Sequence, residues 1–508
     1  MLEMRSRLFH NRAALICLAI AALCIVVIRA CLQSITVDEA DSFLQYARNP
    51  QPSHWWPVSD NHVLNSLLMR LAAAIFGVSN LTVRLPAILG ALLYIGSAFY
   101  LCLLITDRRL LQWLLFSCLV FNPMLLDYLV AARGYSLAIG FFLAALAVIA
   151  SAMMNNGGGA NLSRKSAWIS VLLALSCSAN LSFAIANAVT LTIFFLWTVR
   201  RHGFGRAGYL RLAAATYLPG LLIGFILCGS MVLNWPKGEL YFGSKHMSEM
   251  FDGFAKGSFD DLNPNLINPM LLHVLHPIKS AGPWIVALAA LFLFANMEVS
   301  RFKNPGPQAE SLGNFVRLVA LISAATLLFH WLAFKIVHIP LPKDRTGLFF
   351  LPLWTLALVG SLAYLTRLGI VGIPRRCAIV VLAITAFYFV GCLRLGYFKE
   401  WKFDSDTKTL YWIMADLHQR CGIEKFGIDW RYHLPLNFYR ENYGTDSLKE
   451  FSGSTSGELP PDRDAYAIFF PTSQEFISHQ KLQLLYHNDE SDAAVAIRGC
   501  PAVVPSPP

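Results

Sequence analysis

Two adjacent carboxylates, Asp38 and Glu39, are the residues of this chain whose type and position most suggest chemistry. They follow the first apolar segment, in the stretch that runs from Ile35 to Asp41. A carboxylate held there can accept a proton from an attacking hydroxyl group. A structural interpretation is also available, because Thr36 and Glu39 have the spacing of a capping box and acidic side chains favour a first helical turn. The local sequence is compatible with both interpretations.

A second set of residues could bind a phosphate group. The stretch before the fourth apolar segment contains Arg133 and Tyr135, and a proline-flanked stretch later in the chain contains Lys343 and Arg345. Arginine presents a planar fork of N–H donors that matches the oxygens of a phosphate. For Lys343 and Arg345 the alternative is anchoring at the membrane interface, where basic side chains keep their charge in water.

Three further basic residues lie near the outer ends of apolar segments in the predicted topology: Arg29, Lys335 and Arg394. Each one alone is explained by snorkelling, in which the apolar stem stays in the bilayer and the charge reaches the interface. Taken together, they also suit the binding of an anionic lipid headgroup. The sequence leaves these two explanations open.

The composition indicates an integral membrane protein. Hydrophobic residues make up 56% and charged residues only 14% of the chain, whereas soluble domains carry about 25% charged residues. Apolar runs long enough to cross a bilayer predict eleven spans, at 13–33, 85–105, 110–130, 135–154, 165–181, 182–199, 212–233, 281–297, 316–337, 347–366 and 377–395. The first run exceeds the core of a cleaved signal peptide, so we expect it to remain as an anchor.

The distribution of charge predicts the orientation of these spans. With the N-terminus inside, the inside loops are richer in Lys and Arg than the outside loops, as the positive-inside rule requires. The net charge of +10 then follows from topology, and no nucleic-acid partner is needed to explain it. We expect a multi-pass protein of the cytoplasmic (inner) membrane, in contact with membrane lipids, whose acidic pair and basic stretches face outside.

Two domains are expected. Residues 1–395 would form a transmembrane domain, and its first outside loop, 34–84, would carry an amphipathic helix over 61–77 that lies on the outer membrane surface. The apolar face of that helix holds Leu64, Leu67, Leu68, Leu71 and Ile75. Residues 396–508 contain no membrane-length apolar run and are predicted to form a small α/β domain outside, on the periplasmic side.

The pattern within this C-terminal domain predicts its elements. Strands are expected at 425–430, 465–470, 482–486 and 493–497, helices at 407–418 and 473–479, and a disordered tail at 501–508. Of the 11 cysteines, only Cys421 and Cys500 lie in this domain. An oxidising compartment would let them form a disulfide, and the sequence does not decide whether they do.

These features together resemble the GT-C superfamily of polytopic glycosyltransferases. The features are the many spans, the acidic pair Asp38-Glu39 in the first outside loop, the Arg-x-Tyr motif that opens the fourth span, and the outside domain at the end. The chain is most similar to the branch of the protein O-mannosyltransferases and lipid A aminoarabinose transferases. The resemblance covers roughly residues 10–370 and includes the stretch 77–90 and the stretch 342–346 with Pro352.

The chain departs from the pattern at residues 60–65, which lack the His-Pro-Pro or Lys-Pro-Pro element of many members. The resemblance therefore does not carry over an acceptor. It does imply a sugar donor linked to a polyprenyl phosphate, and an acceptor hydroxyl or amine on a glycan, a lipid or a protein at the outer face. The chemistry requires no cofactor. Some members use a divalent metal, so the resemblance leaves a divalent metal open here, although His273 and His276 have no nearby third ligand and the sequence shows no convincing ligand set.

The resemblance and the chemistry give each candidate residue a role. Asp38 would act as the general base, and Glu39 would orient it or the acceptor. The donor phosphate would be bound by Arg133, Tyr135, Lys343 and Arg345, with Arg84 and Lys335 as weaker candidates. The acceptor or sugar pocket would be lined by His62 and Asn61.

Two other classes of function are considered. A transporter or flippase for lipids or lipid-linked sugars would explain the spans and the outer-face cations equally well. It would predict internal repeats or broken helices near the middle of the membrane, and the sequence shows no such symmetry. A membrane sensor is disfavoured because every inside loop is too short to hold an output domain. The sugar, the acceptor and the length of the lipid carrier are not specified by the sequence.

Overall fold

The computed structural model describes every residue except 1, 49–59, 155–158, 204, 234–239, 241, 301–305, 371, 445–447, 454–458 and 500–508. The chain divides into two compact units. Unit 1 comprises Met1–Val26, Trp56–Asn65 and Pro86–Leu393, and unit 2 comprises Val27–Trp55, Ser66–Leu85 and Arg394–Pro508. Unit 2 thus includes parts of the first outside loop as well as the C-terminal residues. The boundary at 395/396 stays a prediction.

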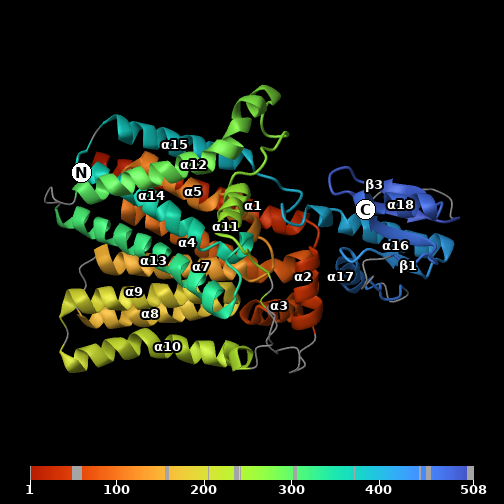
Figure 1. The fold of residues 1–508 in the computed structure, drawn as a ribbon, viewed down its shortest axis with the longest axis horizontal. Coiled ribbons are helices and arrows are strands. Elements are labelled where there is room, and N and C mark those ends of the chain that lie inside the picture. Colours follow the sequence, from red (N-terminus) through yellow and green to blue (C-terminus); the bar gives the residue numbers. More distant parts are fainter. Residues whose placement is uncertain are drawn as a thin grey trace. The chain divides into compact units, whose positions relative to one another are not determined.

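Helices account for nearly all regular structure before residue 392. They are α1 (Leu2–Leu32), α2 (Val37–Asp41), α3 (Val63–Phe76), α4 (Asn80–Ile105), α5 (Arg109–Val120), α6 (Pro123–Tyr128), α7 (Tyr135–Met154), α8 (Gly159–Ala179), α9 (Ala184–His202), α10 (Arg206–Leu233), α11 (Met247–Ser258), α12 (Pro269–Ser300), α13 (Pro307–Val337), α14 (Phe350–Arg367) and α15 (Ile373–Gly391). In unit 1, α8 packs against α7 and α10, and α13 packs against α14 (Figure 1).

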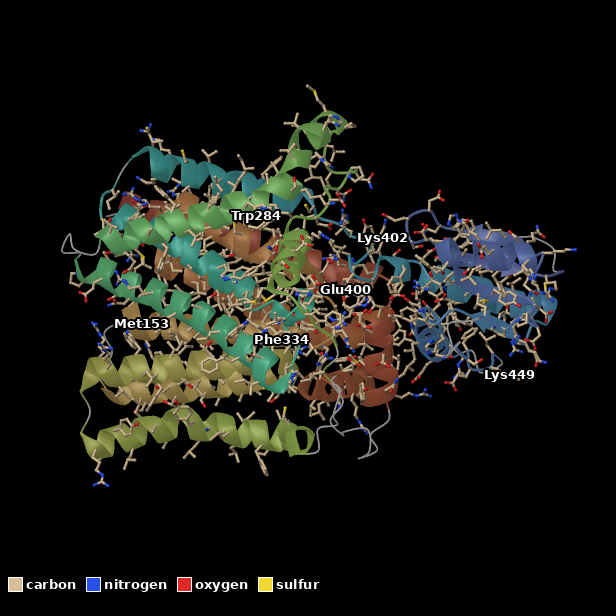
Figure 2. All side chains as sticks on the ribbon, in the orientation of Figure 1. Met153, Trp284, Phe334, Glu400, Lys402 and Lys449 are labelled. Atoms are coloured by element: carbon tan, nitrogen blue, oxygen red, sulfur yellow. The ribbon has the colours of Figure 1, made fainter. Side chains whose placement is uncertain are left out.

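Among the described residues, eight helices are long and apolar enough to cross a membrane: Arg12–Leu32, Asn80–Ile105, Tyr135–Met154, Leu181–His202, Arg206–Gly229, Pro269–Ser300, Pro307–Val337 and Phe350–Arg367. Large apolar side chains on them are exposed, as for Trp284 on α12, which is 71% exposed (Figure 2). Such exposure suits contact with lipid. The predicted class, a polytopic helical membrane protein with a small C-terminal α/β part, is confirmed.

The remaining three predicted spans are also helical, with one interruption. The segments at 165–181 and 377–395 form α8 and α15, of 21 and 19 residues. The segment at 110–130 is not one helix, because α5 ends at Val120 and α6 begins at Pro123. Asn122 caps α6 by accepting a hydrogen bond from the Leu125 N–H at 3.2 Å. Proline fits the first position of a helix, where its missing N–H is not needed.

The close packing of α4 on α7 fixes the start of α7 in unit 1. A Cβ atom placed on Gly140 would lie 2.5 Å from the Gly90 carbonyl oxygen, and one on Gly90 would collide with the backbone of Ser136 and Leu137. The Ser136 hydroxyl donates to the Ala87 carbonyl oxygen at 2.6 Å. Small residues let membrane helices approach this closely.

The C-terminal part of unit 2 is a four-stranded sheet with three helices. Its elements are α16 (Thr407–Cys421), β1 (Phe426–Ile428), α17 (His433–Tyr443), β2 (Ala465–Phe469), α18 (Phe470–His479), β3 (Gln483–His487) and β4 (Ala493–Ile497). The strand order is β1-β2-β4-β3, with β1 parallel to β2 and the other two pairings antiparallel. Tyr466 and Ile468 of β2 and Leu482 lie in its apolar core.

All four predicted strands and both predicted helices of this part are present, and α17 was not predicted. Its polar and aromatic residues, with Pro435 near its start, hide the helical pattern. Cys421 is disulfide-bonded. Cys500 and the tail 501–508 lie outside the described residues.

We predict that Gly90→Ala destabilises the protein by roughly 1–3 kcal/mol, the usual effect of overpacking a tight core, because the added methyl group meets the α7 backbone. Gly96→Ala on the same helix is the matched control, since a Cβ atom there has nothing within 4 Å. Thermal unfolding of the purified variants in detergent checks this. Equal melting temperatures for the two variants would contradict the close approach of α4 and α7.

Candidate functional site

The acidic pair begins a short helix in unit 2 as the structural interpretation predicts. In α2 the Glu39 N–H donates to the Thr36 hydroxyl oxygen at 3.1 Å, and the Thr36 N–H donates to Glu39 Oε2 at 3.0 Å. This reciprocal pair is a capping box. It fixes the backbone of the turn and therefore the position from which the Asp38 side chain extends.

Glu39 also forms a buried ion pair with Arg84 at the start of α4. The Arg84 Nε donates to Glu39 Oε1 at 2.8 Å and Nη2 donates to Oε2 at 2.6 Å. Both side chains are 0% exposed. The remaining N–H groups of the guanidinium donate to the carbonyl oxygens of Ala30, Gln33 and Ser34, at 2.7 to 3.1 Å.

This arrangement separates the roles of the two carboxylates. A guanidinium has five N–H donors, and the five bonds of Arg84 stay within the protein, so Arg84 has no donor left for a phosphate oxygen. The two carboxylate oxygens of Glu39 face Arg84 and the Thr36 N–H. Glu39 is therefore a structural residue of the turn. Asp38 is partly exposed, whereas Glu39 is fully buried.

Arg29 is not a snorkelling residue. It is 1% exposed, its Nη2 donates to the Tyr397 carbonyl oxygen at 3.2 Å, and its guanidinium lies 5.3 Å from the centre of the Phe398 ring. The Arg84 guanidinium lies at the same distance from that ring. Arg394 lies over the ring of Tyr397. Arg29 thus helps to fasten residues 397–398 to the end of α1, where a positive charge also suits the helix dipole.

In unit 1 a second group of candidates comes together around His62. The His62 ring lies edge-on to the Tyr135 ring, with the ring centres 5.7 Å apart, and Tyr135 also contacts Tyr128. Arg133 is 3% exposed, and its Nη2 lies 3.2 Å from Asp60 Oδ1. Residues that the sequence placed far apart in two loops, 60–62 and 133–135, therefore form one buried cluster.

The electrostatics of this cluster include Arg345 as well. Burial lowers the pKa of His62 well below its usual value, and the positive charges of Arg133 and Arg345 lower it further. His62 is therefore neutral at physiological pH. A neutral His62 adds no charge, and Arg133 is paired with Asp60, so the charge of Arg345 leaves these four residues net positive, which favours an anion.

Two backbone features hold the cluster in place. Gly134 has a φ of 74°, and a Cβ atom there would collide with the Ala179 carbonyl oxygen. Only glycine tolerates this left-handed conformation at such close approach. The Asn65 side chain donates to the Ala132 carbonyl oxygen at 3.1 Å and is fully buried. Asn61, one residue before His62, is 5% exposed.

The predicted amphipathic helix is present as α3, and its apolar face is turned outward. Leu71 and Ile75 are 56% and 62% exposed, whereas Asn65 and Met69 are 0% exposed. In a membrane protein an exposed apolar face suits lipid, and a buried polar face suits the protein interior.

The loop that contains Lys343 and Arg345 is held by a segment that the sequence analysis missed. The Ser244 N–H donates to the Leu341 carbonyl oxygen at 2.8 Å, and the Leu341 N–H donates to the Ser244 carbonyl oxygen at 2.9 Å, so the two segments form an isolated antiparallel bridge. Next to this pairing, the Arg345 guanidinium lies 4.5 Å from the centre of the Phe242 ring.

Helix α11 then packs on the same loop. A Cβ atom on Gly253 would lie 2.6 Å from the Asp344 carboxylate, and a Cβ atom on Gly347 would collide with the Phe254 ring. Asp344 itself has a φ of 45°, a strained conformation that this packing maintains. The signal for α11 was present in the sequence, because its buried Met250 and Phe254 are four residues apart.

Two predicted features stand apart from these clusters. Lys335 is exposed in the last turn of α13, with its ammonium group 5.5 Å from the centre of the Phe334 ring (Figure 2 labels Phe334). Within the described part of the chain, no group of three or more His, Cys, Asp or Glu residues could hold a metal ion. His273 and His276 are both exposed on α12.

The solved structures that this chain is similar to include the following three. The crystal structure of ArnT from Cupriavidus metallidurans in the apo state is 13% identical with a TM-score of 0.44, covering 95% of this chain and 98% of that chain. The crystal structure of the same protein bound to undecaprenyl phosphate is 13% identical with a TM-score of 0.44, covering 97% and 99%. That of the Archaeoglobus fulgidus oligosaccharyltransferase complex with Zn and sulfate is 13% identical with a TM-score of 0.41, covering 87% and 58%.

No protein-family model and no curated protein matches the sequence.

We predict that Arg84→Gln destabilises the protein by about 3–5 kcal/mol, because removal of one partner leaves the buried Glu39 charge without its counter-ion. Lys449→Gln, which removes an exposed ion pair with Glu424 in the same unit, is the matched control and should leave stability unchanged. Denaturation in detergent measures both. A melting temperature of Arg84→Gln equal to that of the control would show that the pair does not hold the turn.

Proposed function

We propose that the protein is a membrane glycosyltransferase that moves a sugar from a polyprenyl-phosphate donor to a hydroxyl or amine acceptor. Reaction at the outer face of the cytoplasmic membrane follows from the proposed topology, with the N-terminus inside and residues 396–508 outside. The observation that carries the proposal is the different environment of the two carboxylates in the acidic pair. Glu39 forms a buried ion pair with Arg84, and Asp38 is partly exposed in a turn whose backbone is fixed.

The chemistry assigns Asp38 the role of general base. The acceptor oxygen or nitrogen attacks the anomeric carbon of the sugar, and its proton passes to the Asp38 carboxylate. The bond between the anomeric carbon and the phosphate oxygen breaks, and its electron pair stays on the phosphate. A fixed carboxylate suits this step, because proton transfer requires the base to lie within hydrogen-bond reach of the attacking group.

The leaving phosphate needs positive charge to stabilise it, and the arginines of the cluster in unit 1 support that role. In our proposal Arg133 and Arg345 bind the donor phosphate with Lys343 and Tyr135, and His62 and Asn61 line the sugar or acceptor pocket. Because His62 is neutral, it can donate a hydrogen bond to a sugar hydroxyl or accept one from it. Arg84 leaves the phosphate-binding set, since its donors are used within the protein.

The first test replaces the proposed base. We predict that Asp38→Asn lowers the rate of sugar transfer by roughly 10²–10⁴-fold, the usual contribution of a general base, and leaves the melting temperature unchanged. Asp41→Asn, three residues further along α2, is the matched control and should transfer sugar at the wild-type rate. Transfer of radiolabelled sugar by purified protein measures this. Full activity of Asp38→Asn would end the assignment of the base.

The second test addresses the phosphate. Arg133→Gln and Arg345→Gln should each weaken binding of the lipid-linked donor by about tenfold or more, because each removes a charge-assisted hydrogen bond. Arg70→Gln, at an exposed position of α3, is the control. The KM for the donor measures this effect. In a separate experiment, mass spectrometry of the glycans and glycolipids of cells lacking the gene identifies the sugar and the acceptor. Donor KM values equal to that of Arg70→Gln would remove the two arginines from the phosphate site.

A further inference from the structure

A third carboxyl group in unit 2 lies against the turn that bears the acidic pair. Asp404 is 1% exposed and ends a short 3-10 turn, Lys402–Asp404. Its Oδ2 accepts a hydrogen bond from the Val37 N–H at 2.7 Å, from 367 residues away in sequence. Val37 is the first residue of α2. A side chain from the C-terminal segment therefore caps the helix that carries Asp38.

The neighbours of Asp404 hold the preceding residues of the same turn. The Thr407 hydroxyl lies 3.1 Å from the Ile35 carbonyl oxygen, and the Ser34 hydroxyl donates to the Ser405 carbonyl oxygen at 2.8 Å. The Ile35 N–H donates to the Tyr439 hydroxyl oxygen of α17 at 2.8 Å. Ser34, Ile35 and Val37 are thus bonded to the segment 404–407 or to α17, and Thr36 between them is bonded to Glu39.

The charges around Asp404 are mainly negative. Asp38 and Glu39 face it from α2, and Arg431 and Tyr432 face it from the loop that follows β1, where the carboxylate of Asp429 also acts on Tyr432. The Glu39 charge is matched by Arg84. The Arg431 guanidinium binds both carboxylate oxygens of Asp429, at 2.9 and 3.0 Å. Arg431, which lowers the pKa of Asp404, is therefore already paired with another carboxylate.

The pKa of Asp404 is shifted in the direction expected for a buried acid without its own counter-ion. Burial raises its pKa well above the usual value, and the charges of Asp38 and Glu39 raise it further, against the opposing effects of the Val37 hydrogen bond and Arg431. Its second oxygen, Oδ1, is buried without a hydrogen-bond partner among the described residues. Close carboxyl groups in a low-dielectric site cannot all ionise. When Asp404 is protonated, one of its carboxyl oxygens can still accept the hydrogen bond from the Val37 N–H. The group of carboxylates then carries one negative charge less.

We propose that Asp404 is a positioning residue for Asp38: its protonated carboxyl group fixes the first turn of α2 and leaves the negative charge to the acidic pair. The inference rests on the proposed transferase function and adds a role for the C-terminal segment in the site. Asparagine has the shape and charge of a protonated aspartate, so Asp404→Asn should preserve this role. Alanine removes it.

The test compares three variants in the transfer assay across pH. Asp404→Ala should lower kcat roughly tenfold, the size expected for one lost buried hydrogen bond, with an unchanged KM for the donor. Asp404→Asn should match the wild type at neutral pH and should lack the alkaline decline that appears in the wild type when Asp404 ionises. Asp416→Asn, on α16 and paired with Arg420, is the matched control and should keep the wild-type profile.

Two results would overturn the proposal: an unchanged kcat in Asp404→Ala, or an alkaline decline that persists in Asp404→Asn. A readout without activity keeps the test separate from the proposed function. A raised pKa in the folded state means that wild-type stability is lost as pH rises from the unfolded pKa through the folded one. The melting temperature of Asp404→Asn minus that of the wild type should therefore increase as pH rises. A difference between the two melting temperatures that does not change with pH contradicts the inference. If the wild type transfers no sugar but this shift appears, the proposed function fails and the protonated Asp404 stands.

Discussion

The buried ion pair between Glu39 and Arg84 is the interaction on which the proposed site depends. Two charges removed from water are stable only when their hydrogen-bonding groups are met. Arg84 meets this condition with two bonds to Glu39 and three to the backbone of residues 30–34. One side chain thereby joins the end of α1, the start of α2 and the start of α4. A loop that leaves a membrane helix gains a fixed geometry from this single arginine.

The consequence is that neighbouring acids have different tasks. Glu39 is committed to the protein by Arg84 and by the capping box, so its ionisation serves the fold. Asp38 shares the fixed backbone and keeps a partly exposed side chain, so its ionisation can serve a reaction. Asp404 is buried against the same turn, where it accepts the hydrogen bond of the Val37 N–H and burial raises its pKa.

Local patterns in the sequence predicted much of this arrangement. The capping box at Thr36 and Glu39, the helical segments and the strands of the C-terminal sheet were predicted because they depend on residues close together in the chain. The interruption at Asn122 was missed, although the Asn-Pro signal was present. The pairing of Glu39 with Arg84, 45 residues apart, and of Asp404 with Val37 could not be predicted. They depend on which segments pack together, and one sequence carries no periodic signal for that. Because the sequence does not reveal that Glu39 is the partner of Arg84, it makes Arg84 a candidate phosphate ligand.

The most direct test of the account is the fate of a lipid-linked sugar donor in detergent, where there is no membrane to transport it across. The purified protein, given a polyprenyl-phosphate sugar and a membrane extract as the source of acceptor, is followed by mass spectrometry of the lipid. The account predicts the appearance of free polyprenyl phosphate and the loss of the sugar-bearing lipid. A donor that stays intact in detergent, while the same preparation moves it across the bilayer of reconstituted vesicles, would contradict the account and identify a flippase.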